Sequence, residues 1–118
     1  MKHFLAIYIG TPDVHAKSEW NNLDEATRME RQATGMKAWG DWMVRNQPSV
    51  VFQGGPLGKT LRASVKGIEG IKNTMTGFVL VQAETHEAAA RLFENHPHFS
   101  IFPGDSVEIM ECLPIPGQ

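Results

Sequence analysis

The segment from Met36 to Gly58 constrains the fold most, because it joins three kinds of local structure within a short stretch. Its first part carries Trp39 and Trp42 and predicts the end of a helix, which Asn46 and Pro48 then stop. The apolar residues of Ser49 to Gln53 predict a short strand. Gly54 to Gly58 predicts a sharp corner, since glycine permits positive φ and proline fixes its own φ. We expect the other segments to pack around this unit.

Length and composition predict one soluble domain spanning residues 1–118. Hydrophobic content of 42% and charged content of 20% are ordinary for a globular protein. The net charge is −2 and the basic residues are scattered, so we expect no nucleic-acid partner. No apolar run is long enough for a membrane span. Cys112 is the single cysteine, which predicts a cytoplasmic protein without disulfides.

Three strands are predicted beside the one at Val50. His3 to Ile9 and Phe78 to Ala83 carry apolar side chains on both faces, as expected of central strands. Ser106 to Cys112 predicts the closing strand. Thr60 to Lys66 alternates polar and apolar residues and predicts a half-exposed hairpin arm, with a turn at 67–70 and a polar loop at 72–77.

Two helices are predicted between these strands. The first runs from about Leu23 to Arg45, with Asn22 as its cap and Glu25 in its first turn. Its expected inward stripe follows steps of three or four residues: Met29, Ala33, Met36, Gly40 and Met43. The second begins after Thr85 and ends near Asn95.

The order of these elements predicts an α+β fold, a ferredoxin-like split βαβ sandwich with an inserted β-hairpin. Both helices would cover one face of the sheet. The other face would carry apolar side chains that nothing within the chain covers, and a second copy stacked sheet to sheet would bury it. We therefore expect a homodimer.

Several short motifs, in their order and spacing, resemble the YCII-related domains, a family of the dimeric α/β-barrel group. They are VVFQGGPLGKT, TGFVLVQAETHEAAARLFENHPHF and VEIMECLP, within residues 36–114. The Trp39-x-x-Trp42 pair resembles a branch whose members mostly lack an assigned activity. The resemblance implies a ferredoxin-like subunit, a barrel-forming dimer and a cleft between sheet and helices.

Some members of the broader family are proposed enzymes that use a His–Asp pair, with the histidine in the first helix. This chain departs from that pattern, because the helix predicted from Leu23 to Arg45 contains no histidine. His15 precedes the helix in a loop or first turn. We therefore do not assign the His–Asp pair of these family members to this chain.

His96 and His98 bracket Pro97 and are the first candidate catalytic residues, because a neutral imidazole can act as acid or base near pH 7. No third ligand accompanies them, so no metal site is predicted. The structural alternative is that one histidine caps the C-terminus of the second helix while the other is exposed. We expect this structural role for the two histidines rather than a catalytic one.

Asp41 is the third catalytic candidate, because a carboxylate beside a tryptophan-lined pocket would have a raised pKa. Its position on a helix favours an exposed side chain instead. The predicted ligand-binding wall consists of Trp39, Trp42, Phe52, Gly55, Pro56 and Phe99. The tryptophans can equally belong to the core.

The sequence Gly58-Lys59-Thr60 invites comparison with a phosphate-binding loop. The spacing from Gly54 is one residue too short and no helix follows, so a phosphate loop is excluded. The sequence predicts a small organic ligand and no cofactor. Two functions stay open: proton-transfer chemistry of a lyase or isomerase type, and a non-catalytic binding or structural dimerisation module.

Overall fold

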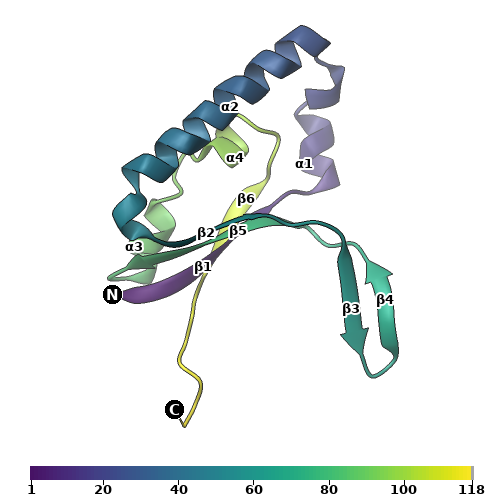
Figure 1. Cartoon of the computed structure of the whole chain (residues 1–118). Coiled ribbons are helices and arrows are strands. Elements are labelled where there is room, and N and C mark those ends of the chain that lie inside the picture. Colours follow the sequence, from purple (N-terminus) through teal and green to yellow (C-terminus); the bar gives the residue numbers. More distant parts are fainter. Residues whose placement is uncertain (118) are drawn as a thin grey trace.

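A computed structural model describes residues 1–117, which form a four-stranded antiparallel sheet with all helices on one face (Figure 1). The strand order is β2-β5-β1-β6, with β1 at Lys2–Ile9, β2 at Val50–Pro56, β5 at Met75–Ala83 and β6 at Ser106–Glu111. This order is that of the ferredoxin-like fold, so the predicted fold class is confirmed. Within residues 1–117, no helix is long and apolar enough to cross a lipid bilayer.

The helices begin where side chains can accept the free backbone N–H groups of a first turn. They are α1 at Pro12–Lys17, α2 at Glu25–Arg45, α3 at His86–Arg91 and α4 at Pro97–Ser100, with short 3₁₀ turns η1 at Trp20–Asn22 and η2 at Gln47–Ser49. Thr85 caps α3 by accepting the N–H of Ala88 at 3.0 Å, as the sequence predicts.

The cap of α2 differs from the prediction. Asp24, not Asn22, accepts the N–H of Thr27 at 2.7 Å, because Asn22 belongs to the preceding turn η1. The inward face of α2 also differs, since Gly35 and Trp42 are its buried residues. Met29 and Met36 are 61% and 62% exposed, whereas Met43 packs against the core, so only part of the predicted stripe is packed.

The hairpin extends away from the sheet, on the side opposite to the helices (Figure 1). It consists of β3 at Thr60–Ser64 and β4 at Gly67–Ile71, with Val65 and Lys66 as its turn. The turn predicted at 67–70 is therefore wrong, because Arg62 and Glu69 pair across the two strands. The polar loop predicted at 72–77 is also shorter, since β5 starts at Met75.

The core lies between the sheet and the helices. Alternate residues of β1 and β5 point toward the helices, and their register places Phe4 opposite Val81 and Ala6 opposite Val79. These side chains pack with residues of the helical layer: Trp42, Ala89 and Phe93. Trp42 is 2% exposed, and its indole N–H donates to the carbonyl of Leu92 at 2.8 Å. This hydrogen bond fixes the C-terminal half of α2 against the α3 segment.

Candidate functional site

An apolar cavity lies between the C-terminal half of α2 and one end of the sheet, and its volume is about 520 Å³. Helix α2 supplies Met36, Trp39, Gly40 and Met43, and the remaining wall comes from Tyr8, Gln53, Gly54, Gly55, Pro56, Thr76, Gly77, Phe78 and Phe102. No Asp, Glu, Lys, Arg or His belongs to this lining among the residues that the structure describes. The cavity therefore offers an uncharged surface.

The glycine-containing end of β2, where the sequence predicts a corner, shapes one wall of the cavity. Gly54 has a φ of 64°, and a Cβ there would lie 2.1 Å from the carbonyl oxygen of Phe78. Only glycine fits this position without moving the backbone. The register of β2 against β5 shifts between Phe52 and Gly55, as in a β-bulge, and the shift turns Gly55 and Pro56 along the cavity.

Two glycines of α2 shape the space beside the cavity in different ways. Gly35 packs on the ring of Phe102, where a Cβ would lie 2.5 Å from a ring carbon. This close approach lets the loop after α4 bring Phe102 into the wall. A Cβ added at Gly40 would meet no neighbouring group within 4 Å, so the missing side chain leaves the space beside Trp39 open.

Tyr8 connects the cavity wall with the two buried histidines. Its hydroxyl lies 3.4 Å from Nε2 of His96. Nδ1 of His96 accepts the backbone N–H of His98 at 3.0 Å, and this contact also caps α4. Nε2 of His98 donates to the carbonyl oxygen of Ile9 at 2.7 Å. The chain of contacts thus runs from the cavity wall into the protein interior.

Burial keeps these three groups uncharged. The pKa of His96 is lowered to about 4, mainly by desolvation and to a smaller extent by the charge of His98. Burial also lowers the pKa of His98, while the Ile9 carbonyl and the carboxylate of Asp105 oppose this shift. Burial raises the pKa of Tyr8. At neutral pH the site therefore holds a neutral phenol and neutral imidazoles.

The position of the histidines differs from the expected structural alternative. His96 is 0% exposed and His98 is 7% exposed, and His96 caps the N-terminus of α4 rather than the C-terminus of α3. The helix predicted to Asn95 already ends at Arg91, and Asn95 has a φ of 57°. Gly104 covers His98 closely, since a Cβ there would lie 2.3 Å from the imidazole.

The other predicted site residues divide between the cavity and the rest of the molecule. Trp39, Gly55 and Pro56 line the cavity. Trp42 belongs to the core, and Phe52 is 57% exposed with its ring 6.0 Å from that of Phe78. These two residues, and Phe99 at 38% exposure, are not in the cavity lining. Their predicted role as a ligand wall is not supported by this geometry.

Asp41 lies on the exposed side of α2. Its carboxylate pairs with the ammonium group of Lys37 at 3.3 Å, and the side chain of Asp41 is 55% exposed. It is not among the lining residues of the cavity. The exposed position that the helix geometry favours is therefore the observed one.

Tyr8 is a buried polar lining residue that the sequence patterns did not single out. It shares the inward face of β1 with Phe4 and Ala6 and is 4% exposed. A tyrosine on a core face needs a partner for its hydroxyl. That requirement is the one available signal in the sequence, but it does not identify His96 as the partner.

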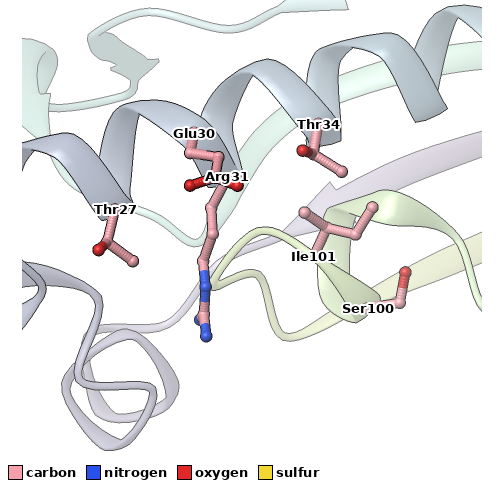
Figure 2. A pocket seen from close by; sticks show the side chains of 6 residues that line it. All are labelled: Thr27, Glu30, Arg31, Thr34, Ser100 and Ile101. Atoms are coloured by element: carbon pink, nitrogen blue, oxygen red, sulfur yellow. The ribbon is translucent and has the colours of Figure 1, made fainter.

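A second cavity, of about 430 Å³, lies between the first half of α2 and α4 (Figure 2). Its lining is mostly polar: Thr27, Glu30, Arg31, Thr34, Ser100 and Ile101. The side chain of Arg31 extends from α2 into this space (Figure 2). Four of these residues, Glu30, Arg31, Thr34 and Ser100, are exposed. This open polar groove lacks the enclosure of the apolar cavity. No group of His, Cys, Asp or Glu able to hold a metal ion occurs within residues 1–117.

No protein-family model matches the chain, and no curated protein matches it. Among solved structures, the chain is similar to the 5-chloro-2-hydroxyhydroquinone dehydrochlorinase of Burkholderia phenoliruptrix AC1100, in complex with 2,5-dihydroxybenzoquinone. The sequence identity is 16%, the TM-score is 0.48, and the match covers 92% of this chain and 90% of that chain. The likeness is one of overall fold alone.

Proposed function

We propose that the protein binds a small, uncharged and largely apolar organic molecule in the cavity beside Trp39. The observation that carries this proposal is the uncharged lining of the cavity, whose volume of about 520 Å³ falls in the usual range for small-molecule sites. Aromatic residues of three different segments, Tyr8, Trp39 and Phe102, contribute to it. A charged ligand would find no opposite charge among these lining residues.

Filling the cavity tests this proposal. Gly40→Phe places a bulky side chain at the open position of the wall, and Ala33→Phe places the same side chain on an exposed part of the same helix. A set of uncharged mono- and bicyclic compounds is screened against both variants by ligand-observed NMR. We expect Gly40→Phe to weaken binding by at least about tenfold, and Ala33→Phe to bind like the wild type. Equal binding by both variants would contradict the proposal.

Binding without proton transfer is the function that the electrostatics favour. A general base works best with a pKa near the working pH, and the pKa of His96 is lowered to about 4. His96 and His98 also lie behind Tyr8 and Trp39 rather than in the lining. The lyase or isomerase chemistry predicted for His96, His98 and Asp41 stays a prediction. If the wild type forms a product and His96→Asn does not, this result would support proton-transfer chemistry at His96.

We also propose a homodimer that buries the sheet face opposite to the helices. Leu5 lies opposite Leu80 and Met110 on neighbouring strands, and Ile7 lies opposite Phe78, so apolar residues continue across this face. The hairpin and the C-terminal tail extend on the same side (Figure 1). Burial of such a face against a second copy removes apolar surface from water.

The molar mass in solution tests the homodimer. Leu80→Arg places a charge on the uncovered sheet face, whereas Val44→Arg places it on the outer side of α2, where Val44 is 74% exposed. Light scattering should give two chains for the wild type and for Val44→Arg, and one chain for Leu80→Arg. One chain for the wild type would contradict the proposed dimer.

The proposed family is the YCII-related domains of the dimeric α/β-barrel group. Support comes from the order of the motifs on the fold: the corner of Gly54 to Gly58 overlaps the end of β2, Gly77 and Phe78 lie in β5, and Val107 to Ile109 lie in β6. Cys112 is exposed and unpaired, which suits the reducing cytoplasm proposed as the location.

A further inference from the structure

We infer that the ligand of the cavity beside Trp39 is an uncharged ring compound with a carbonyl oxygen, which accepts a hydrogen bond from the Tyr8 hydroxyl. This inference rests on the proposed function and narrows its ligand class. It depends on where the protons of the Tyr8–His96–His98 chain lie.

The backbone of His98 determines the tautomer of His96. A backbone N–H can only donate, so Nδ1 of His96 must be the acceptor of the 3.0 Å contact with His98. A neutral imidazole carries one proton, and His96 is neutral at pH 7 because it is completely buried. The proton of His96 therefore lies on Nε2, the atom that faces the Tyr8 hydroxyl.

The Tyr8 oxygen then receives a proton from its neighbour rather than giving one to it. Nε2 of His96 is the hydrogen-bond partner of this hydroxyl within residues 1–117, at 3.4 Å. With Nε2 already protonated, the phenol hydrogen of Tyr8 has no protein acceptor in that part of the chain. Tyr8 belongs to the cavity wall, so a ligand in the cavity can supply the acceptor.

The cavity selects against a charged acceptor. Its lining contains neither a cationic nor an anionic side chain within residues 1–117. A carboxylate would lose its hydration without gaining a countercharge, whereas a neutral carbonyl loses much less. Of the other polar side chains in the lining, the Thr76 hydroxyl already donates to the carbonyl oxygen of Tyr8 at 3.0 Å, and Gln53 is exposed to solvent. Tyr8 is thus a buried donor that is free for a neutral oxygen, and Tyr8→Phe separates its contribution from those of the Trp39 indole N–H and the Gln53 amide.

The shape of the wall favours a ring. The rings of Tyr8 and Trp39 lie 4.9 Å apart and those of Trp39 and Phe102 lie 6.1 Å apart, and all three residues line the cavity. Aromatic surfaces at such spacing pack well against flat apolar compounds. A compact ring ketone has both the flat apolar ring and the neutral carbonyl oxygen.

Three probes of similar size test the inference: acetophenone, ethylbenzene and benzoate. Their dissociation constants are measured near pH 7.5 by NMR titration, with the wild type and with Tyr8→Phe, which removes the hydroxyl and keeps the ring. We expect the wild type to bind acetophenone about fivefold to tenfold more tightly than ethylbenzene and to bind benzoate most weakly. In Tyr8→Phe the preference for acetophenone should disappear while ethylbenzene still binds.

The outcomes separate this inference from the proposed function. Equal binding of acetophenone and ethylbenzene by the wild type, or tightest binding of benzoate, would overturn the inference and leave a small-molecule site. No binding of any probe at millimolar concentration would overturn both. If Tyr8→Phe does not fold, nitrogen-15 NMR of histidine-labelled wild type decides instead, since a proton on Nδ1 of His96 would overturn the assigned direction of the hydrogen bonds.

Discussion

Nδ1 of His96 accepts the backbone N–H of His98 at 3.0 Å, and this contact directs the proton of His96 toward the hydroxyl of Tyr8. A histidine is thereby built into the core as a neutral hydrogen-bonding group. The cost of charging it there links the stability of the fold to pH.

The first prediction concerns this pH dependence. The unfolded imidazole of His96 takes up a proton below its ordinary pKa of 6.5, whereas the folded one stays neutral until about 4. The unfolded state therefore binds more protons between these values, and acidification through this window lowers the free energy of unfolding. From about pH 7.5 to about pH 5, His96 should contribute a loss of about 2 kcal/mol. Burial of His98 acts in the same direction.

Urea unfolding at the two pH values measures this loss. His96→Asn keeps a side chain that can cap α4 but removes the titrating group, so its stability should fall less on acidification. His3→Asn removes an exposed histidine and should behave like the wild type. An equal loss of stability in the wild type and in both variants would show that His96 is not the group responsible for the pH dependence.

The second prediction concerns the two glycines near the end of β2. Gly54→Ala should lower the free energy of unfolding by about 2 to 4 kcal/mol, because φ is positive and the added Cβ meets the Phe78 carbonyl. The neighbouring Gly55 has an open Cβ position and no positive φ. Gly55→Ala should therefore change stability by well under half as much. Chemical denaturation of both variants gives the comparison, and similar losses would argue against the bulge.

The third prediction compares two glycines on α2. Gly40→Ala should stabilise the protein by about 0.5 to 1 kcal/mol, because alanine favours the helix and nothing lies near the added Cβ. Gly35→Ala should lose this gain and be less stable than Gly40→Ala by about 1 to 3 kcal/mol, since Phe102 must move. Thermal unfolding of the two variants measures the difference, and equal melting temperatures would contradict it.

Sequence patterns predict most of the architecture. The strands around Ala6, Val51, Val79 and Ile109 and the order of the elements follow from apolar alternation and from glycine and proline breakers. The predicted turn of the hairpin is wrong, because Gly67 and Gly70 resemble turn residues although both lie in β4. Gly67 has a φ of 101° directly after the turn, whereas Gly70 pairs with Leu61 across the hairpin.

The site is less accessible from the sequence. Trp39, Gly55 and Pro56 can be identified as wall residues, since aromatic and corner residues are distinctive in sequence. The burial of His96 cannot be predicted in this way, because it depends on Tyr8, which lies 88 positions away along the chain. The inward face of α2 is only partly predicted, since Met43 lies against the core but Gly35 and Trp42 are the buried residues of the helix.

The fourth prediction concerns Asp41, the carboxylate that the sequence offers as a base. Asp41→Asn removes an exposed ion pair with Lys37 that is worth at most about 0.5 kcal/mol. Ligand affinity and the melting temperature should stay close to those of the wild type. A tenfold loss of affinity for acetophenone in Asp41→Asn would show that the carboxylate reaches the ligand.

The most direct test of the account is a two-dimensional NMR titration of the nitrogen-15-labelled wild type with acetophenone. We predict that the largest shifts occur at the Trp39 indole N–H and at the backbone amides of Gly40, Gly54, Gly55 and Gly77, all of which line the cavity. The indole N–H of Trp42, which is buried against Leu92, should shift much less. Shifts confined to the uncovered sheet face or to the groove beside Arg31 would contradict the proposed binding site.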